Sequence, residues 1–474
     1  MGCTVTGFTA ELSISEARRE FAAPRAHTIW QDVNTWLALL PLLFISVGGK
    51  VDLAPGPVAL RFTAVAQDSF AHRLAFVTCL FLIIGLISTR AREVRKILFR
   101  SRLLLLLPAI ACISAAWSQN PTHTLVSSCN LMLTTLFAIY LYVRYPKDSL
   151  LLFLTGGAAI CLVLSLLAVI FMPSLGTDPY QQDAWRGLFS QRNNCATVCT
   201  LFFALAVHLK PTSIGERMLR FLVIALAILF IVMSGSRTGW ILSLLALVLT
   251  YTFDIVGRMP GTDRAATKAA LFGVSLVGGV LLYLNFSGAL AVLGKDPTLT
   301  QRTAIWASVI PSVLKHPFLG YGFGAFWSGL NGESMQTILV TGWMEGQAQN
   351  GYLDVLLQLG LLGFCPLVWL FIRALIKGGS ASASGGRTQM MKVSTVLLVL
   401  VLVENIGETS FLDPYGLLWL YSLLAILVLT VRPSFNAIAA DTAEALPPIA
   451  HAEPVPLWPV RDGGLRPRVL ESGT

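Results

Sequence analysis

The chain has 474 residues, of which 55% are hydrophobic and 12% are charged. A soluble domain usually carries about 25% charged residues, and a soluble protein this apolar would expose large apolar patches to water. The composition therefore favours a membrane protein. The net charge of +9 does not indicate nucleic-acid binding, because the basic residues sit in short clusters between apolar runs, as in loops at a cytoplasmic membrane surface.

The apolar runs predict an all-α polytopic integral membrane protein. A membrane-spanning helix needs about 20 apolar residues, and the chain offers about twelve such segments. We expect residues 1–32 and 432–474 to be cytoplasmic tails, the second one disordered, and residues 33–431 to form the transmembrane domain. The expected spans are residues 33–49, 74–89, 103–118, 124–143, 149–172, 194–209, 218–234, 238–256, 268–292, 351–375, 391–406 and 414–431.

The distribution of basic residues predicts the orientation. With the N-terminus in the cytoplasm, 25 of the 34 basic residues fall in inside loops or tails and 9 fall outside, as expected when cytoplasmic loops are enriched in Lys and Arg. We therefore expect both termini to be cytoplasmic, in a bacterial inner membrane. Arg192 and Arg237 are informative exceptions, because each lies outside and right at a membrane boundary.

Two outer segments are long enough to carry a site, residues 173–193 and the larger loop 293–350 between the ninth and tenth spans. Within the larger loop, residues 301–314 predict an amphipathic helix, which Pro317 would end. Its apolar side is expected to consist of Ile305, Trp306, Val309, Ile310 and Val313.

Two arginine-containing motifs predict an anion site on the outer face. Residues 185–194 include Arg186, Arg192 and Asn193, and the planar guanidinium group matches phosphate oxygens. An asparagine at 193 or 194 could also cap the following helix. Residues 234–240 form a tight turn that holds Ser236 and Arg237, where glycines would let a ligand approach the backbone. The alternative interpretation is a snorkelling arginine with an ordinary helix cap for the first motif, and a surface arginine in a hairpin turn for the second.

Two further polar motifs lie in or beside the larger loop. Arg302 precedes the aromatic, glycine-rich run 316–324, which suits a sugar or a lipid headgroup or, equally, forms plain turns. Residues 346–354 place Gln349, Asn350 and Tyr352 at the outer mouth of the tenth span, and Asp354 about one turn deeper, facing the bundle. Glu404 and Glu408 form a small acidic cluster that we interpret first as packing and capping.

In this order and spacing, these segments resemble the O-antigen ligase and polymerase superfamily, and most of all the ExoQ-like exopolysaccharide polymerases of the Wzy type. The resemblance covers roughly residues 30–430. The residues that carry it are Trp185-Arg186-Gly187, Arg192-Asn193, Ser236-Arg237, Arg302 with Ile305-Trp306, residues 317–324, and residues 348–353 with Gly360 and Gly363.

The resemblance implies a glycosyltransferase that works on the periplasmic face and polymerises oligosaccharide repeat units carried on undecaprenyl pyrophosphate. It implies no metal or other cofactor, and it implies membrane lipid, a chain-length regulator and a flippase as partners. Arg192 and Arg237 would hold the diphosphate, with Arg302 as a third cation. The remaining expected substrate-binding residues are Arg186, Asn193, Ser236, Asn350 and Tyr352.

One departure from the family concerns the general base. The family usually has His-Asn where this chain has Gln349-Asn350, and glutamine cannot take up a proton at neutral pH. Glu345 becomes a candidate catalytic group, with Glu333 and His316 as further options. Alternatives to a polymerase are a ligase that transfers polysaccharide to lipid A core or protein, a lipid-linked sugar flippase or transporter, and an inactive scaffold of an export complex.

Overall fold

A computed structural model of the chain describes residues 29–47, 70–178, 181, 184–258, 273, 300–328, 332–341, 346–381 and 388–431. All of these belong to the unit formed by residues 1–431. The C-terminal tail, most of the N-terminal tail, Glu345 and nearly all of the expected ninth span lie outside the described residues.

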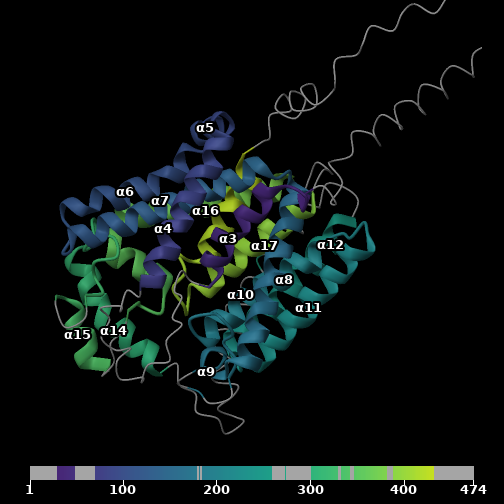
Figure 1. The fold of residues 1–474 in the computed structure, drawn as a ribbon. Coiled ribbons are helices and arrows are strands. Elements are labelled where there is room, and N and C mark those ends of the chain that lie inside the picture. Colours follow the sequence, from purple (N-terminus) through teal and green to yellow (C-terminus); the bar gives the residue numbers. More distant parts are fainter. Residues whose placement is uncertain are drawn as a thin grey trace, which may run out of the picture. The chain divides into compact units, whose positions relative to one another are not determined.

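The described part of the chain is helical, and its only extended pairing is one isolated antiparallel bridge between Thr177 and Trp185. Short 3₁₀ turns cover Arg102–Leu105 and Ser114–Ala116. The α-helices are α3 Val33–Ser46, α4 Phe70–Thr89, α5 Ala91–Arg100, α6 Leu106–Ile113, α7 Pro121–Arg144, α8 Lys147–Phe171, α9 Pro173–Gly176, α10 Arg192–His208, α11 Ile214–Met233, α12 Arg237–Arg258, α14 Thr300–Lys315, α15 Ser334–Thr341, α16 Gly351–Ala381, α17 Gln389–Glu404 and α18 Leu417–Thr430 (Figure 1).

The helical class is as predicted, but the count of twelve spans remains a prediction. A helix occupies each expected span that the structure describes. Among the described residues, three helices are long and apolar enough to cross a membrane alone, Pro121–Arg144, Asp148–Phe171 and Gly351–Gly378. The 14-residue helices α3 and α18 are about 21 Å long, against a hydrocarbon core of about 30 Å.

Local breaks explain why some expected spans are shorter or bent. The expected span 103–118 is a short α-helix between two 3₁₀ turns, and it contains Pro108, which has no N–H to donate to the preceding turn. Helices α4 and α5 meet at an angle of 91°, so they form a bent pair rather than a straight rod.

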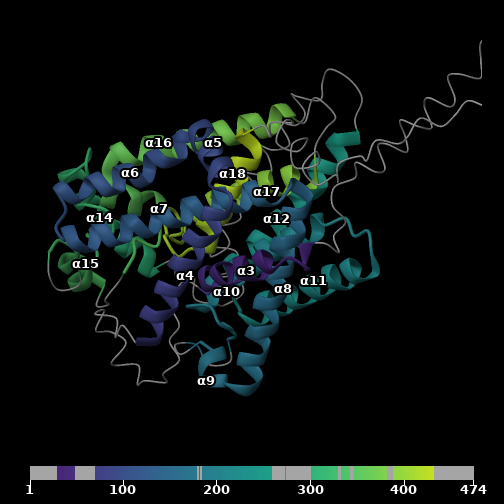
Figure 2. The same cartoon turned by 45° about the horizontal axis from the view of Figure 1, so that its top comes forward.

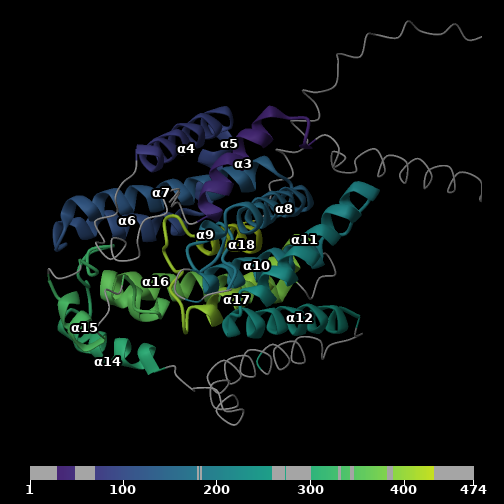
Figure 3. The same cartoon turned by 60° about the horizontal axis from the view of Figure 1, so that its bottom comes forward.

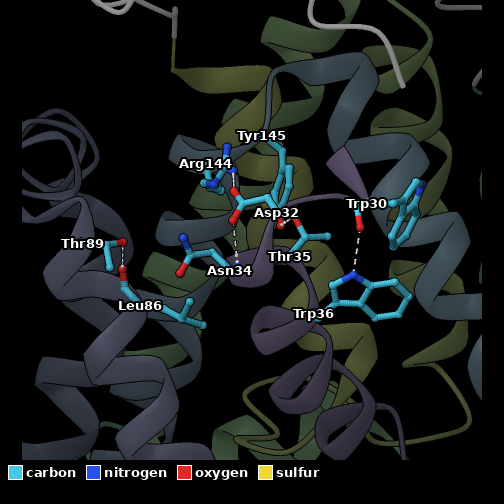
Figure 4. Close-up of polar contacts among 9 residues, drawn as sticks. All are labelled: Trp30, Asp32, Asn34, Thr35, Trp36, Leu86, Thr89, Arg144 and Tyr145. Carbon is cyan, nitrogen blue, oxygen red and sulfur yellow. Dashed lines mark hydrogen bonds and ion pairs between the residues drawn. The ribbon is translucent and has the colours of Figure 1, made fainter. Parts of the chain in front are cut away.

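Asp32 fixes the start of α3 to the end of α7. Its carboxylate accepts a hydrogen bond from the Asn34 backbone N–H at 2.8 Å and forms an ion pair with Arg144 (Figure 4). The Tyr145 hydroxyl contacts the Thr35 hydroxyl at 3.1 Å, next to this pair. A capped N-terminus and a cross-helix ion pair thus hold this end of the bundle together.

Helices α10, α11 and α12 pack side by side, with α17 against α10 and α12 (Figures 1 and 3). The loop 209–213 turns α11 back along α10, and the tight turn 234–236 turns α12 back again. Helices α10 and α12 are therefore parallel, and their N-termini lie at the same end.

Residues of the larger outer loop pack onto the first part of α16, which runs beside α6 and α14 (Figure 2). The predicted helix 301–314 is confirmed as α14, with Ile305 and Val309 buried, although Ile310 is 45% exposed. Ile305 and Val309 form a small separate core with Tyr321, Phe326, Ala348 and Leu357. The loop therefore includes a helical subdomain, as the sequence suggested.

Candidate functional site

The candidate site begins where two parallel helices start with an arginine. Arg192 is the first residue of α10 and Arg237 is the first residue of α12. The two helices touch along matched positions, because the Thr200 and Ser243 hydroxyls lie 2.8 Å apart. A Cβ added at Gly239 would lie 2.3 Å from Ala196 Cβ. This close packing fixes the two arginines next to each other.

The electrostatics of this end of the helices favour an anion. A helix N-terminus carries a partial positive charge, so two aligned N-termini reinforce the charge of two guanidinium groups. Arg237 is exposed, while Arg192 is half-buried and donates from Nη1 to the Gly235 carbonyl at 3.4 Å. Asp178 provides a counter-charge, since its Oδ2 accepts from the Arg192 backbone N–H at 3.1 Å.

Arg302 and Asn193 meet on one carboxylate, that of Glu408 in the segment between α17 and α18. Arg302 Nη2 lies 2.5 Å from Glu408 Oε1, and Asn193 Nδ2 donates to the same oxygen at 3.0 Å. Burial raises the pKa of the Glu408 carboxyl above its ordinary value, against the opposing effect of Arg302 and Asn193. Neither asparagine of the 193–194 pair caps α10, whose N-cap residue is Gln191.

The start of α16 joins the same segment. Asn350 caps this helix, because its Oδ1 accepts from the backbone N–H groups of Tyr352 and Leu353 at 3.0 and 3.1 Å. The Gly351 N–H donates to the backbone carbonyl of Glu408 at 2.9 Å. The Tyr352 hydroxyl donates to the Leu402 carbonyl at 2.8 Å. Asn193, Arg302 and the start of α16 are thus joined through residues 402–408.

Gln349 stands in this mouth with an unusual backbone. Its φ of 49° is in the left-handed region, which is uncommon for a residue other than glycine and costs of order 1–3 kcal/mol. Ala348 before it accepts a hydrogen bond from Trp306 Nε1 at 3.1 Å, and Asn350 after it is the helix cap. The surrounding contacts therefore hold position 349 in a strained geometry, as is common in functional sites.

Comparison with known proteins agrees with the resemblance found in the sequence. Residues 222–368 match the O-Antigen ligase family. The chain is 26% identical over 327 residues to the exopolysaccharide production protein ExoQ of Rhizobium meliloti, a match that covers 64% of this chain and 71% of that protein. It is 27% identical over 159 residues to an O-antigen ligase of Pseudomonas aeruginosa, covering 33% of this chain and 34% of that protein.

The matches support an ExoQ-like member of the O-antigen ligase superfamily. Together with the apolar helices, they support a multi-pass membrane protein with a polysaccharide polymerase or ligase type of function. The matched region 222–368 includes Arg237, Arg302, Gln349 and Asn350. Arg192, Asn193 and Glu408 join the same site from outside that region.

Two of the predicted substrate-binding residues form their hydrogen bonds within the fold. Arg186 is buried, and its Nε and Nη1 donate to the carbonyls of Leu175 and Ser190 at 3.0 and 3.3 Å. Ser236 is buried, and its Oγ accepts from the Gly239 N–H at 3.4 Å at the start of α12. Both side chains shape the loops that carry the arginines, and direct contact with substrate remains a prediction for them.

The glycine-rich run 316–324 has a packing role in the described structure. Gly320 and Gly360 both have positive φ. A Cβ at Gly320 would lie within 2.7 Å of the backbone of residues 357–358, and a Cβ at Gly360 would lie within 2.7 Å of the backbone of residues 318–319. The Tyr321 and Gly322 N–H groups donate to α16 carbonyls at 2.8 and 3.0 Å. The run therefore fills the break in α16 at Gly360, which supports the plain-turn interpretation.

Asp354 also has a packing role. As predicted it is buried, and its Oδ1 accepts from Trp327 Nε1 at 2.8 Å and from the Ala348 N–H at 3.2 Å. Gln358 donates to its other oxygen. These contacts fix the outer loop against α16 directly below the polar mouth.

The residue that our sequence-based site lacks is Glu408. The sequence contained a signal for it, because a carboxylate one turn from Glu404 at the end of an apolar helix is costly unless it has a partner. We interpreted the pair as packing and capping. The structure shows that Glu408 has side-chain partners from two distant helices, α10 and α14.

Proposed function

We propose that this chain is a periplasmic-face glycosyltransferase that polymerises undecaprenyl-diphosphate-linked oligosaccharide units into an exopolysaccharide. The observation that carries the proposal is the pair of parallel helix N-termini with Arg192 and Arg237 side by side. Arg302 adds a third guanidinium from the outer loop. Such a cluster at a helix-terminus site suits a diphosphate group.

The proposed chemistry needs a stabiliser of negative charge on the leaving diphosphate. As the bond between C1 of the donor sugar and the phosphate oxygen breaks, charge develops on that oxygen. Fixed guanidinium groups and helix N-termini in a site of low dielectric stabilise such charge without reorganisation. In this proposal the arginines fill the role for which other enzymes use a metal ion, and attack by an acceptor hydroxyl from the opposite face inverts the configuration at C1.

A polymerase and a ligase share this first half of the reaction and differ in the acceptor. The longer match to an exopolysaccharide production protein favours the polymerase. The match to an O-antigen ligase keeps transfer to lipid A core or to protein as the second candidate. Long lipid-linked polymer in a product gel supports polymerisation, whereas polysaccharide attached to lipid A core or to protein supports ligation.

The direct test replaces Arg237 by alanine and by lysine in a strain that lacks the native gene. Loss of one such contact costs about 10²–10³-fold in rate by analogy with oxyanion donors. Lysine restores the charge without the planar fork, so we expect partial activity. Arg217→Ala is a matched control. Arg217 is also exposed and lies in the first turns of a helix, but it is at the N-terminal end of α11, whereas the turn that leads to Arg237 follows the C-terminal end. Full polymerisation by both Arg237 variants would contradict the proposal.

A further inference from the structure

The Glu408 carboxyl group is buried but has one open oxygen. Its side chain is 7% exposed. Oε1 accepts from both Arg302 and Asn193. Among the described residues, no hydrogen bond occupies Oε2. The two donors hold Oε1 and orient the group so that Oε2 remains available.

The position of Glu408 places that oxygen at the mouth of α16. The Glu408 backbone carbonyl accepts from the Gly351 N–H at 2.9 Å, and Gly351 is two residues after Gln349. The charge of Arg192 also acts on Glu408. The carboxylate is therefore next to both the arginine cluster and the polar segment 346–350.

Three charged groups face Glu408 from the packed elements, namely Arg302 from α14, Arg192 from α10 and Glu404 from α17. The arginines favour the ionised form, whereas burial and the second carboxylate favour the protonated form. A carboxyl group with its pKa raised toward neutrality by burial is a better proton acceptor at neutral pH than one with an ordinary pKa.

We propose that Glu408 is the proton acceptor of the glycosyl transfer, an inference that rests on the proposed function. The acceptor hydroxyl oxygen forms a bond to C1 of the donor sugar, and the bond from C1 to the diphosphate oxygen breaks with its electron pair on the diphosphate. The hydroxyl proton passes to Oε2 of Glu408, and water takes it up after product release.

Two other carboxyl or imidazole candidates are less suited by their contacts. Glu333 forms an ion pair with Lys315 at 2.8 Å on the outer loop. His316 is exposed and packs edge-on against the Tyr321 ring, with the centroids 4.7 Å apart. Neither has a contact with the arginines of the site in the described structure.

The test compares Glu408→Gln and Glu408→Asp in purified protein. Glutamine keeps an oxygen for Arg302 and Asn193 but cannot take up a proton, and aspartate keeps a shorter carboxylate. Undecaprenyl diphosphate binding shows whether each variant retains the folded anion site. Initial transfer rates are then measured against pH, with Glu333→Gln as the control that removes an outer-loop carboxylate elsewhere.

We expect Glu408→Gln to bind undecaprenyl diphosphate but to transfer sugar at least about 100-fold more slowly, the range for loss of a general base. The wild-type rate should rise with pH through the titration of Glu408. That acidic limb should persist in Glu408→Asp and Glu333→Gln, and be absent from the residual rate of Glu408→Gln. A residue that only positions Arg302 would lower kcat and leave the limb in place.

The outcomes separate the two proposals. An active wild-type protein together with a Glu408→Gln variant of near-normal rate, or one with an unchanged acidic limb, overturns the role of Glu408 alone. A wild-type protein that forms no glycosidic product and does not bind undecaprenyl diphosphate overturns the proposed function, and the proton-transfer role with it.

Discussion

Gly239→Ala should disable the protein although it adds only a single methyl group. Gly239 lies in the first turn of α12, where it faces Ala196 of α10. The new Cβ would lie 2.3 Å from Ala196 Cβ and 3.3 Å from Ala196 Cα. Carbon atoms in ordinary contact are about 3.5–4.0 Å apart. Helices α10 and α12 would therefore have to separate by about 1 Å or more at the level of the arginines.

The expected effect on activity is larger than the effect on stability. Overpacking of this kind usually costs about 1–3 kcal/mol of unfolding free energy. A displacement of about 1 Å in groups that position a reacting substrate can cost on the order of 10²-fold in rate. Arg237 is two residues from Gly239 and Arg192 is four residues from Ala196, so the shift moves one guanidinium group relative to the other.

The assay is transfer from a lipid-diphosphate donor, with thermal unfolding of the detergent-solubilised protein measured in parallel. Ala196→Gly in the Gly239→Ala background moves the methyl group to the other helix and should restore both activity and stability. Gly85→Ala in α4 is the matched control, because no atom lies within 4 Å of its new Cβ. Alanine there should stabilise the helix slightly, by up to about 1 kcal/mol.

Two results would refute the reasoning. Wild-type activity in Gly239→Ala would mean that the spacing of α10 and α12 does not matter for the site. Failure of Ala196→Gly to rescue a folded but inactive Gly239→Ala protein would mean that the loss has another cause than the contact with Ala196.

Two further predictions concern Gln349 and Asp32. Gln349→His places a titratable ring just before the start of α16, and we expect equal or higher transfer activity. An inactive but well-folded variant would contradict this. Asp32→Asn removes the ionised partner of Arg144 and should lower the unfolding free energy by up to about 1 kcal/mol, since asparagine remains a good helix N-cap. Burial raises the pKa of Asp32, but its hydrogen bond to Asn34 and the nearby Arg144 together hold it below the ordinary value. This stabilisation is present above the ordinary aspartate pKa and is lost as the pH falls through the folded-state pKa, so melting curves of the two proteins should converge in acid.

The sequence predicted the helices well because hydrophobic runs are local signals. Every expected span that the structure describes contains a helix, and the amphipathic pattern located α14. Lengths were less accurate. One expected span consists of three short helical pieces that change type at 105/106 and 113/114, and hydropathy alone does not place such breaks within an apolar run.

The site was only partly predictable because its contacts join distant segments. The charge rule and the family resemblance singled out Arg192, Arg237 and Arg302. The Glu408 carboxylate meets partners 106 and 215 residues away in the chain, and no periodic pattern carries such a pairing. Our interpretation of the 234–240 glycines was wrong for Gly239, since the space over it is filled by Ala196 rather than being open to a ligand.

The three arginines are not equivalent, and their contacts rank them. Arg302 is neutralised by Glu408 at 2.5 Å, so a diphosphate must compete with that carboxylate for it. Arg192 is half-buried and has Asp178 at its backbone N–H. Arg237 is exposed and, in the described part of the chain, has no ion-pair partner. The incoming diphosphate should therefore meet Arg237 first, and binding should depend most on Arg237 and least on Arg302. Conversely, drawing Arg302 toward the phosphate would remove one of the two donors from Oε1 and its positive charge from Glu408, so donor binding would make the carboxylate a stronger acceptor for the proton that the acceptor hydroxyl must lose.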